Sequence, residues 1–288
     1  MARDFSDCVN AKSLNLMNPY FLTGFSDAES SFSVSIRSKS NSKGEVKWVV
    51  EPEFQIGLSY KDEELLRAIK TSFECHSKSG LRAGKVGTIQ VNNNKSFFRV
   101  SSLSELIEII DHFDSYPLLT KKRKDYLIWR EVILRVQRGE HQTFEGVRDI
   151  VKLKSALNLG LSDKLRKEFD ITSEEERAAA LNKCELGNEQ LSINAQWIAG
   201  FTSGEGNFMI GLRKEGKLGK IPQLRFQLTQ HSSPSGSSDE ELFRRLALYF
   251  CCGKVYVRSS NGRQAVEFTV QNFSEILERI IPLLASQW

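Results

Sequence analysis

Two glutamates stand at the same position of a phrase that the chain contains twice. The first copy reads Leu22-Thr-Gly-Phe-Ser-Asp-Ala-Glu29, and the second reads Ile198-Ala-Gly-Phe-Thr-Ser-Gly-Glu205. Each glutamate is preceded, five residues earlier, by a glycine, Gly24 or Gly200. Glycines let two helix backbones approach closely. We therefore expect two packed helices that bring Glu29 and Glu205 together on a pseudo-twofold axis.

Two carboxylates that approach each other repel unless a cation lies between them. A divalent metal held by oxygen ligands is the simplest explanation for the pair. Such a metal can activate water for phosphodiester hydrolysis, and two symmetric carboxylates can serve one strand each. A single glutamate at a helix end is more often solvated or structural. Two glutamates at equivalent positions of a repeat instead favour a catalytic role.

Other catalytic chemistries find little support. The four histidines are scattered, which argues against a zinc hydrolase or an HNH-type nuclease; they are His76, His112, His141 and His231. The chain has no Gly-x-x-x-x-Gly-Lys-Ser/Thr loop for a nucleotide. Asp27 is matched by Ser203 in the second copy, so we do not expect both halves to require an acid there.

The duplication extends beyond the two phrases. Four further pairs of segments recur in order: Phe54–Leu58 with Phe226–Gln230, Asp62–Leu66 with Asp239–Phe243, Gly84–Val86 with Gly253–Val255, and Ser104–Ile110 with Ser274–Ile281. The spacings that separate these segments are similar in the two copies, so insertions fall in loops. A repeat of this length indicates two halves with the same order of elements.

Each half is predicted to contain a helix, a hairpin, a helix, a second hairpin and a helix. Apolar residues alternate with polar ones after each glutamate, namely Phe32, Val34 and Ile36 in the first copy and Phe208, Ile210 and Leu212 in the second. Such alternation is typical of a half-buried strand. We therefore expect an α+β fold in which helices cover one face of an antiparallel sheet and the other face is polar and basic.

The domain organisation follows from the repeat. We assign residues 1–150 to the first half, 151–191 to a helical and charged connector, and 192–288 to the second half. The second half ends at residues 282–288, whereas the first continues through an amphipathic segment at 121–137. We therefore expect a shortened second half of reduced stability.

Composition sets the broad class of the protein. The 288 residues are 40% hydrophobic and 26% charged, and no apolar run approaches the ~20 residues of a membrane span, so we expect a soluble protein without a membrane partner. The net charge of +4 is mildly basic, and Lys and Arg gather in loops. Five cysteines without a Cys-x-x-Cys pair argue against a disulfide framework and a structural zinc site. The N-terminus has neither a signal peptide nor a transit peptide pattern.

The two phrases resemble the paired motifs of single-chain LAGLIDADG homing endonucleases. Three segments are similar to the fungal organellar branch of that family: His112–Lys122, Leu157–Asp163 and Gly200–Gly206. The resemblance covers nearly the whole chain after Asn18. It implies two pseudo-symmetric αββαββα halves, with the motif helices at their interface and the two sheets forming a saddle over a long DNA duplex.

The resemblance also implies a metal site and a DNA-binding face. The metal ligands would be Glu29 and Glu205, with the carbonyls of Ala28 and Gly204 as further ligands. The implied metal is Mg²⁺ or Mn²⁺, whereas Ca²⁺ would bind without supporting cleavage. The residues expected to contact DNA are Ser31, Ser33, Ser35, Arg37, Lys39, Gln55, Thr88, Gln90 and Arg99 in the first half, and Asn207, Met209, Arg213, Arg225, Gln227, Thr229, Lys254, Tyr256 and Arg258 in the second.

Family members also use a peripheral Lys or Gln to organise the attacking water. The best-matched pair of candidates is Gln55 with Gln227, followed by Lys85 with Lys254. By resemblance, each strand would be cut across the minor groove to leave 3′ overhangs. The partner would be double-stranded DNA with a long asymmetric target, and the protein would be monomeric, mitochondrial and organelle-encoded.

Two other functions remain open at this point. The same fold serves RNA-binding intron maturases, and a DNA-binding relic without activity is also compatible with the sequence. Retention of both glutamates favours the nuclease, because RNA binding requires neither.

Overall fold

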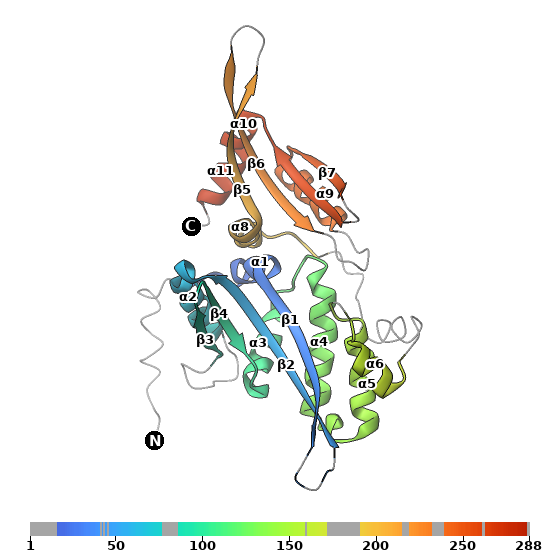
Figure 1. Cartoon of the computed structure of the whole chain (residues 1–288). Helices are drawn as coiled ribbons and strands as arrows, with labels where there is room; N and C mark the ends of the chain where they lie inside the picture. Colours follow the sequence, from blue (N-terminus) through green and yellow to red (C-terminus); the bar gives the residue numbers. More distant parts are fainter. Residues whose placement is uncertain are drawn as a thin grey trace, which may run out of the picture.

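The chain folds into two halves that share one order of elements (Figure 1). The computed structural model describes residues 16–40, 42, 44, 46–76, 86–158, 160–171, 191–214, 219–231, 239–260 and 263–286. The first half contains α1 (Pro19–Glu29), β1 (Ser30–Ser40), β2 (Val46–Ser59), α2 (Glu63–His76), β3 (Thr88–Asn92), β4 (Lys95–Val100), α3 (Leu103–Ser115), α4 (Lys122–Gln137), α5 (Phe144–Ser155) and α6 (Asp163–Phe169). The second contains α8 (Ala195–Glu205), β5 (Gly206–Lys214), β6 (Lys220–His231), α9 (Glu240–Phe250), β7 (Lys254–Ser260), β8 (Arg263–Val270), α10 (Phe273–Glu275), η5 (Ile276–Ile280) and α11 (Ile281–Ala285).

The predicted fold class is confirmed. Both sheets are antiparallel and have equivalent strand orders, β1-β2-β4-β3 and β5-β6-β8-β7. Helices α1 and α8 lie side by side between the two sheets (Figure 1). No helix within the described ranges is long and apolar enough to cross a membrane.

The two motif helices begin and end alike. Asn18 caps α1 by accepting a hydrogen bond from the amide of Tyr20, and Asn194 caps α8 through the amide of Gln196. A side-chain oxygen at this position satisfies an amide that has no partner within the helix. Each helix ends at its glutamate, and a strand begins at the next residue. The local sequence thus places Glu29 and Glu205 at equivalent positions, each the last residue of its helix.

The predicted close approach of the two helices is confirmed at both glycines. A methyl group on Gly24 would overlap the carbonyl oxygen of Trp197 and lie 2.9 Å from the amide nitrogen of Phe201. A methyl group on Gly200 would overlap the carbonyl oxygen of Phe21 in the same way. The contact is therefore reciprocal, backbone against backbone, and no residue with a β-carbon fits at either position without a shift of the helices.

The register of the edge strands corrects one part of the predicted repeat. Gln55 pairs with Arg99, which pairs with Thr88, while Gln227 pairs with Thr269, which pairs with Lys254. Thr88 is therefore the counterpart of Lys254, so the pairing of Lys85 with Lys254 is wrong by three residues. The segments Gly84–Val86 and Gly253–Val255 have the same sequence. The structural counterpart of Gly253 is nevertheless Gly87, because both glycines have a positive φ and directly precede the paired strands. Lys85 itself lies outside the described residues.

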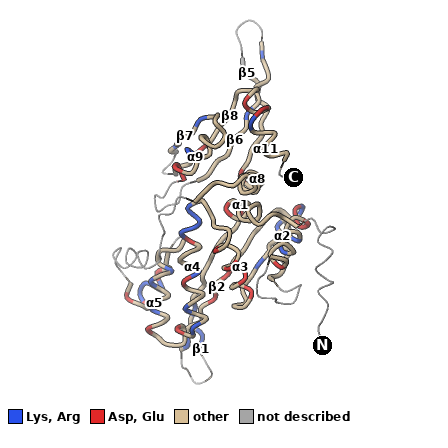
Figure 2. The backbone as a smooth tube through the Cα atoms, turned by 180° about the vertical axis from the view of Figure 1, so that it is seen from behind, with Lys and Arg blue, Asp and Glu red and all other residues tan. Residues whose placement is uncertain are grey.

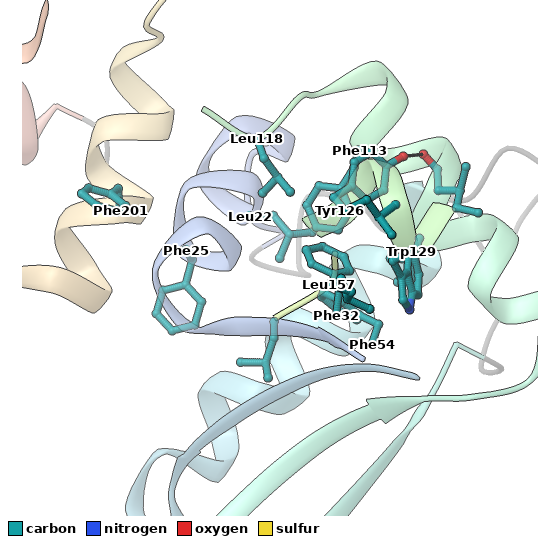
Figure 3. Close-up of a cluster of buried hydrophobic side chains, with 14 of the residues drawn as sticks. Leu22, Phe25, Phe32, Phe54, Phe113, Leu118, Tyr126, Trp129, Leu157 and Phe201 are labelled. Atoms are coloured by element: carbon teal, nitrogen blue, oxygen red, sulfur yellow. Dashed lines mark hydrogen bonds between the residues drawn. The ribbon is translucent and has the colours of Figure 1, made fainter. Parts of the chain in front are cut away.

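The helix-facing side of the first sheet is buried beneath aromatic rings. Phe32 packs against Phe54, Phe113, Tyr126 and Trp129, and the ring centroids of Phe32 and Trp129 are 5.1 Å apart (Figure 3). Tyr126 and Trp129 come from α4, which lies across β1 and β2. Helix α4 therefore covers the apolar face that begins directly after Glu29.

In the second sheet the equivalent face is buried on β6 and β8 but exposed on β5. Phe208, Ile210 and Leu212 on β5 are 57%, 78% and 67% exposed, whereas Phe32, Val34 and Ile36 are buried. An apolar pocket of about 900 Å³ lies at the foot of this face, lined by residues of both halves that include Phe21, Phe25, Phe208 and Leu284. Within the described part of the chain, no helix takes the place over β5 that α4 takes over β1.

The segment assigned to the connector begins within the first half's own packing. Helix α5 spans the boundary placed at residue 150, and Phe169 of α6 packs against Trp48 of β2 at 4.8 Å. Residues 172–190 lie outside the described ranges. The division of the chain at residues 150 and 191 therefore stays a proposal.

Replacing Gly24 with Ala is expected to destabilise the fold by about 2 kcal/mol or more, because the new methyl group forces two backbones apart. Denaturant unfolding of Gly24→Ala and Gly200→Ala measures this cost. Gly211→Ala is the matched control, since its nearest new neighbour is a carbonyl oxygen at 3.8 Å, and it should change the free energy of unfolding by less than about 0.5 kcal/mol. Equal stability of all three variants would contradict the close contact.

The two β-strand positions five residues after the glutamates should respond differently to truncation. Val34→Ala is expected to cost about 1–3 kcal/mol, because Val34 is 3% exposed. Ile210→Ala removes more atoms but should cost less than about 1 kcal/mol, because Ile210 is 78% exposed. Thermal unfolding of both variants tests the contrast, and a larger loss at residue 210 would show that this face is covered.

Candidate functional site

The two motif glutamates face each other at the junction of the halves. A methyl group on Gly204 would touch the side chain of Ala28 and lie 3.2 Å from Oε1 of Glu29, so the Glu29 carboxylate lies against the last turn of α8. Burial raises the pKa of Glu29. Burial, followed by the charge of Glu29, raises the pKa of Glu205 to about 7. The predicted convergence of the two carboxylates is therefore present, and it carries an electrostatic cost.

A lysine at the start of α4 lies beside this carboxylate pair. Nζ of Lys122 donates to the carbonyl oxygens of Ser26 at 3.0 Å and Ala28 at 3.2 Å, in the last turn of α1. Burial lowers the pKa of Lys122 to about 8, and the charges of Asp27, Glu205 and Glu29 oppose that shift. Figure 2 shows the basic start of α4 beside the motif helices. Lys122 thus bonds the backbone at the end of α1 and places its positive charge near Asp27, Glu205 and Glu29.

Sequence reasoning did not select Lys122 as a site residue. It belongs to the segment that carried the family resemblance, but it lies 93 positions from Glu29 in the chain. The basic residues in the first turn of α4 have the sequence pattern of a solvated surface. The one feature that could have pointed to Lys122 as a site residue is its position directly after the turn that follows α3.

That turn, residues 116–121, is bound to both halves. The buried carboxylate of Asp27 accepts hydrogen bonds from the amide of Leu119 at 2.8 Å, the hydroxyl of Thr120 at 2.6 Å and the indole of Trp197 at 2.8 Å. On the other side, the amide of Lys121 donates to Asp239, the N-terminal cap position of α9, at 2.6 Å. The second copy has no such role for Ser203, whose hydroxyl donates within its own helix to Ala199.

The residues at the junction fit an oxygen-ligated divalent cation that needs further ligands. No group of three or more His, Cys, Asp or Glu residues suited to a metal occurs among the described residues. A metal between Glu29 and Glu205 would have two carboxylate ligands, whereas a hard cation requires about six oxygens. The Ala28 carbonyl, expected as a ligand, accepts a hydrogen bond from Lys122 here. Water and phosphate oxygens of a bound nucleic acid are suitable remaining ligands.

The residues expected to contact DNA lie on one face of each sheet. In the first sheet, Ser31 on β1 is opposite Gln55 on β2, which is opposite Arg99 on β4 and then Thr88 on β3. Ser33, Ser35, Arg37 and Lys39 follow on the same face of β1, and Gln90 on the same face of β3. Residues directly opposite each other in a ladder point the same way. This face is the one that the helices leave open.

The second sheet repeats the arrangement with different side chains. Asn207 is opposite Gln227, then Thr269 and Lys254, and this row matches the row that starts at Ser31. The register also places Met209, Arg225, Thr229, Tyr256 and Arg258 on this face. Arg213 occupies the same face of the β5 backbone, but its side chain lies outside the described residues.

Acidic residues that sequence reasoning left out of the contact set share these faces. Glu51 and Glu53 pair with Ser35 and Ser33, and Glu267 pairs with Thr229. Glu51 binds Arg37 at 2.5 Å, and Glu267 lies 2.7 Å from Arg258. Alternation along β2 already places Glu53 on the polar face, but only the strand register shows which side chain lies opposite each acid.

The accessory candidates fall into two groups. Gln55 and Gln227 lie opposite the second residue after each motif glutamate. Lys254 lies three strand spacings from Asn207, or about 14 Å, which favours a DNA contact for it. Gln230 was not among the candidates, although its Oε1 atom is buried without a hydrogen-bond partner. It lies two residues beyond the partner of Gly206 in the ladder of β5 with β6, beside the end of α8.

Comparison with known proteins agrees with this geometry. The LAGLIDADG endonuclease family model matches residues 22–133 and 198–287, one region in each half. A protein of Neurospora crassa named as a probable intron-encoded endonuclease is 34% identical over 272 residues, covering 92% of this chain and 55% of the relative. A second N. crassa relative with a similar name is 31% identical and is covered over 46% of its length. The chain thus spans about half the length of these relatives.

Solved structures extend the likeness to the whole fold. I-SmaMI bound to an uncleaved DNA target in the presence of calcium ions is 32% identical, with a TM-score of 0.76 over 94% of this chain and 85% of that one. The LAGLIDADG homing endonuclease I-GzeII in complex with its DNA target is 30% identical, with a TM-score of 0.75 over 94% of this chain and 84% of that one. Paired motif regions, paired sheets and converging glutamates lead to one conclusion: this chain belongs to the LAGLIDADG endonuclease family.

Proposed function

We propose that this protein is a site-specific endonuclease that cuts both strands of a DNA duplex with a divalent metal. The observation that carries the proposal is the meeting of Glu29, Glu205 and Lys122 at the point where two polar sheet faces join. Two equivalent acids at a pseudo-twofold junction suit two equivalent phosphodiester bonds. The relatives' names and the DNA-bound structures support the same activity.

The recognition surface is the pair of sheet faces. Arg can read guanine, and Gln or Asn can read adenine, in the major groove. The first face is rich in Ser, whereas the second carries Arg225, Tyr256 and Arg258, so the two faces suit different half-sites. We propose a long asymmetric target bound by a monomer and cut across the minor groove to leave 3′ overhangs. The names of the two N. crassa relatives support an intron-encoded origin, and we propose that the protein is mitochondrial and organelle-encoded.

The metal is proposed to be Mg²⁺ or Mn²⁺, held by Glu29 and Glu205 together with the backbone carbonyls at the ends of α1 and α8. A bound divalent ion lowers the pKa of its water and neutralises charge on the phosphate. Burial raises the pKa of both carboxylates, and in Glu205 the neighbouring acid adds to the shift. Their negative charges are therefore unfavourable without a cation between them. Calcium is proposed to support binding without cleavage.

The remaining roles belong to the chain's own side chains. Lys122 holds the end of α1 and places a positive charge beside both carboxylates. This charge can stabilise the negative charge that develops on the scissile phosphate. Gln55 and Gln227 lie at equivalent positions next to the two acids and are proposed to orient the attacking water.

Replacing either motif acid by its amide should abolish double-strand cleavage, because the amide keeps the shape but loses the charge that binds metal. Cleavage is selected on a randomised duplex library with Mg²⁺, comparing the wild type with Glu29→Gln and Glu205→Gln. We expect each variant to lose at least about 100-fold in rate while retaining DNA binding in Ca²⁺.

Two outcomes count against the proposal in different ways. If either amide variant cleaves DNA at the rate of the wild type, the assigned mechanism is rejected. A wild type that cuts no duplex, with or without Mn²⁺, would instead support an RNA-binding splicing cofactor or an inactive DNA-binding relic. Adding EDTA to an active reaction should stop it, and excess Mg²⁺ should restore it.

Lys122→Gln is expected to lower the single-turnover cleavage rate by on the order of 100-fold, because the charge shared by both carboxylates is removed. Lys124→Gln, in the same turn of α4, is the control for a general loss of positive charge and should change the rate little. Rates are measured at saturating DNA, and the salt dependence of binding is measured alongside. Equal losses in both variants would assign Lys122 to DNA attraction alone.

A further inference from the structure

Asp27 connects three segments that are remote in sequence. Its carboxylate is fully buried and accepts hydrogen bonds from Leu119, Thr120 and Trp197. Two of these donors belong to the turn after α3, and the third belongs to α8 of the other half. Desolvating a carboxylate is costly unless hydrogen bonds compensate it. A buried acid with this many partners is therefore a fixed point around which the turn and both motif helices are arranged.

Thr120 extends this constraint to Lys122. Its hydroxyl donates to Oδ1 of Asp27 at 2.6 Å and accepts from the backbone amide of Lys122 at 3.2 Å. That amide belongs to the first residue of α4, where backbone donors have no partner within the helix. The chain of contacts runs from Asp27 through Thr120 to the backbone of Lys122, whose ammonium group then returns to the carbonyl oxygens of Ser26 and Ala28.

The second copy of the motif lacks this arrangement. Ser203 stands at the position of Asp27, and its hydroxyl donates to Ala199 within the same helix. The hydrogen-bonded link from the motif helix to the following turn is thus present in the first half, and in the second copy the equivalent side chain bonds within α8.

We propose that Asp27 is a positioning residue that acts through Thr120 to hold Lys122 at the end of α1, near the two motif glutamates. The inference rests on the proposed nuclease function for its kinetic consequence, but the placement of Lys122 can be measured without any DNA. Displacing a catalytic group by about 1 Å can lower the reaction rate by on the order of 100-fold. Loss of the Thr120 contact should therefore lower the rate of cleavage more than it lowers DNA affinity or stability.

Thr120 offers the sharpest test, because two small substitutions separate the hydroxyl from the packing. Thr120→Val keeps the shape and removes the link, whereas Thr120→Ser keeps the hydroxyl. We expect Thr120→Val to lower the single-turnover rate on the selected target by about 10- to 100-fold, with the Kd for DNA in Ca²⁺ unchanged. Thr120→Ser should retain a rate close to that of the wild type.

A second readout needs neither metal nor substrate. Acylation of lysines by a water-soluble amine reagent, followed by mass spectrometry, reports the accessibility and basicity of Lys122 relative to Lys124 in the same sample, and Thr120→Val, which removes no charge, isolates the accessibility. Thr120→Val and Asp27→Ser should increase the relative labelling of Lys122. Thr120→Ser and the matched control Ser203→Ala should leave it at the wild-type level.

The outcomes separate the two ideas. If the wild type cuts no duplex, the proposed function fails, and the labelling ratio still decides whether Asp27 and Thr120 hold Lys122. If Thr120→Val matches Thr120→Ser in labelling, the positioning role is overturned. It is also overturned if Thr120→Val loses cleavage, DNA affinity and melting temperature in parallel, because that pattern shows a structural bond with no particular effect on Lys122.

Discussion

The backbone contact between α1 and α8 is the constraint on which the rest of the structure depends. Gly24 and Gly200 allow each helix to place a carbonyl oxygen where any other residue would place a β-carbon. Because both helices end at a glutamate, this contact also sets how close the two carboxylates lie. The same two helices therefore join the halves and assemble the candidate metal site. A substitution that changes the helix contact must also disturb the site.

The carboxylates of Glu29 and Glu205 repel each other, and the surrounding structure partly offsets this repulsion. Burial raises the pKa of both Glu29 and Glu205, and the two charges oppose each other. Lys122 and Lys121 supply positive charge near Glu205, and a divalent cation would supply more. Asp27 does not join the pair, because its carboxylate is committed to Thr120, Leu119 and Trp197. Carboxylates two residues apart on one helix thus have different partners and different proposed roles.

The repeat is a symmetry of the backbone more than of the side chains. Both sheets have the same strand order and register, yet the apolar face of β1 is covered by α4 and that of β5 is open. The polar faces differ as well, with serines on β1 and a mixture of Asn, Met and Gly on β5. Equivalent backbones with unlike side chains suit the proposed asymmetric target, since base readout depends on the side chains that the sheets present.

The sequence by itself determined the elements and their duplication, because alternation and repetition are local signals. The paired glutamates, the close approach at Gly24 and Gly200, and the polar face that begins at Ser31 were all predictable in this way. Strand register was not, so Lys85 was paired with Lys254 and the acids Glu51 and Glu267 were left out of the polar faces. Only the tertiary structure brought Lys122 to the last turn of α1 and gave Asp27 its partners, because those contacts join segments 90 or more residues apart, and no pattern along the chain records them.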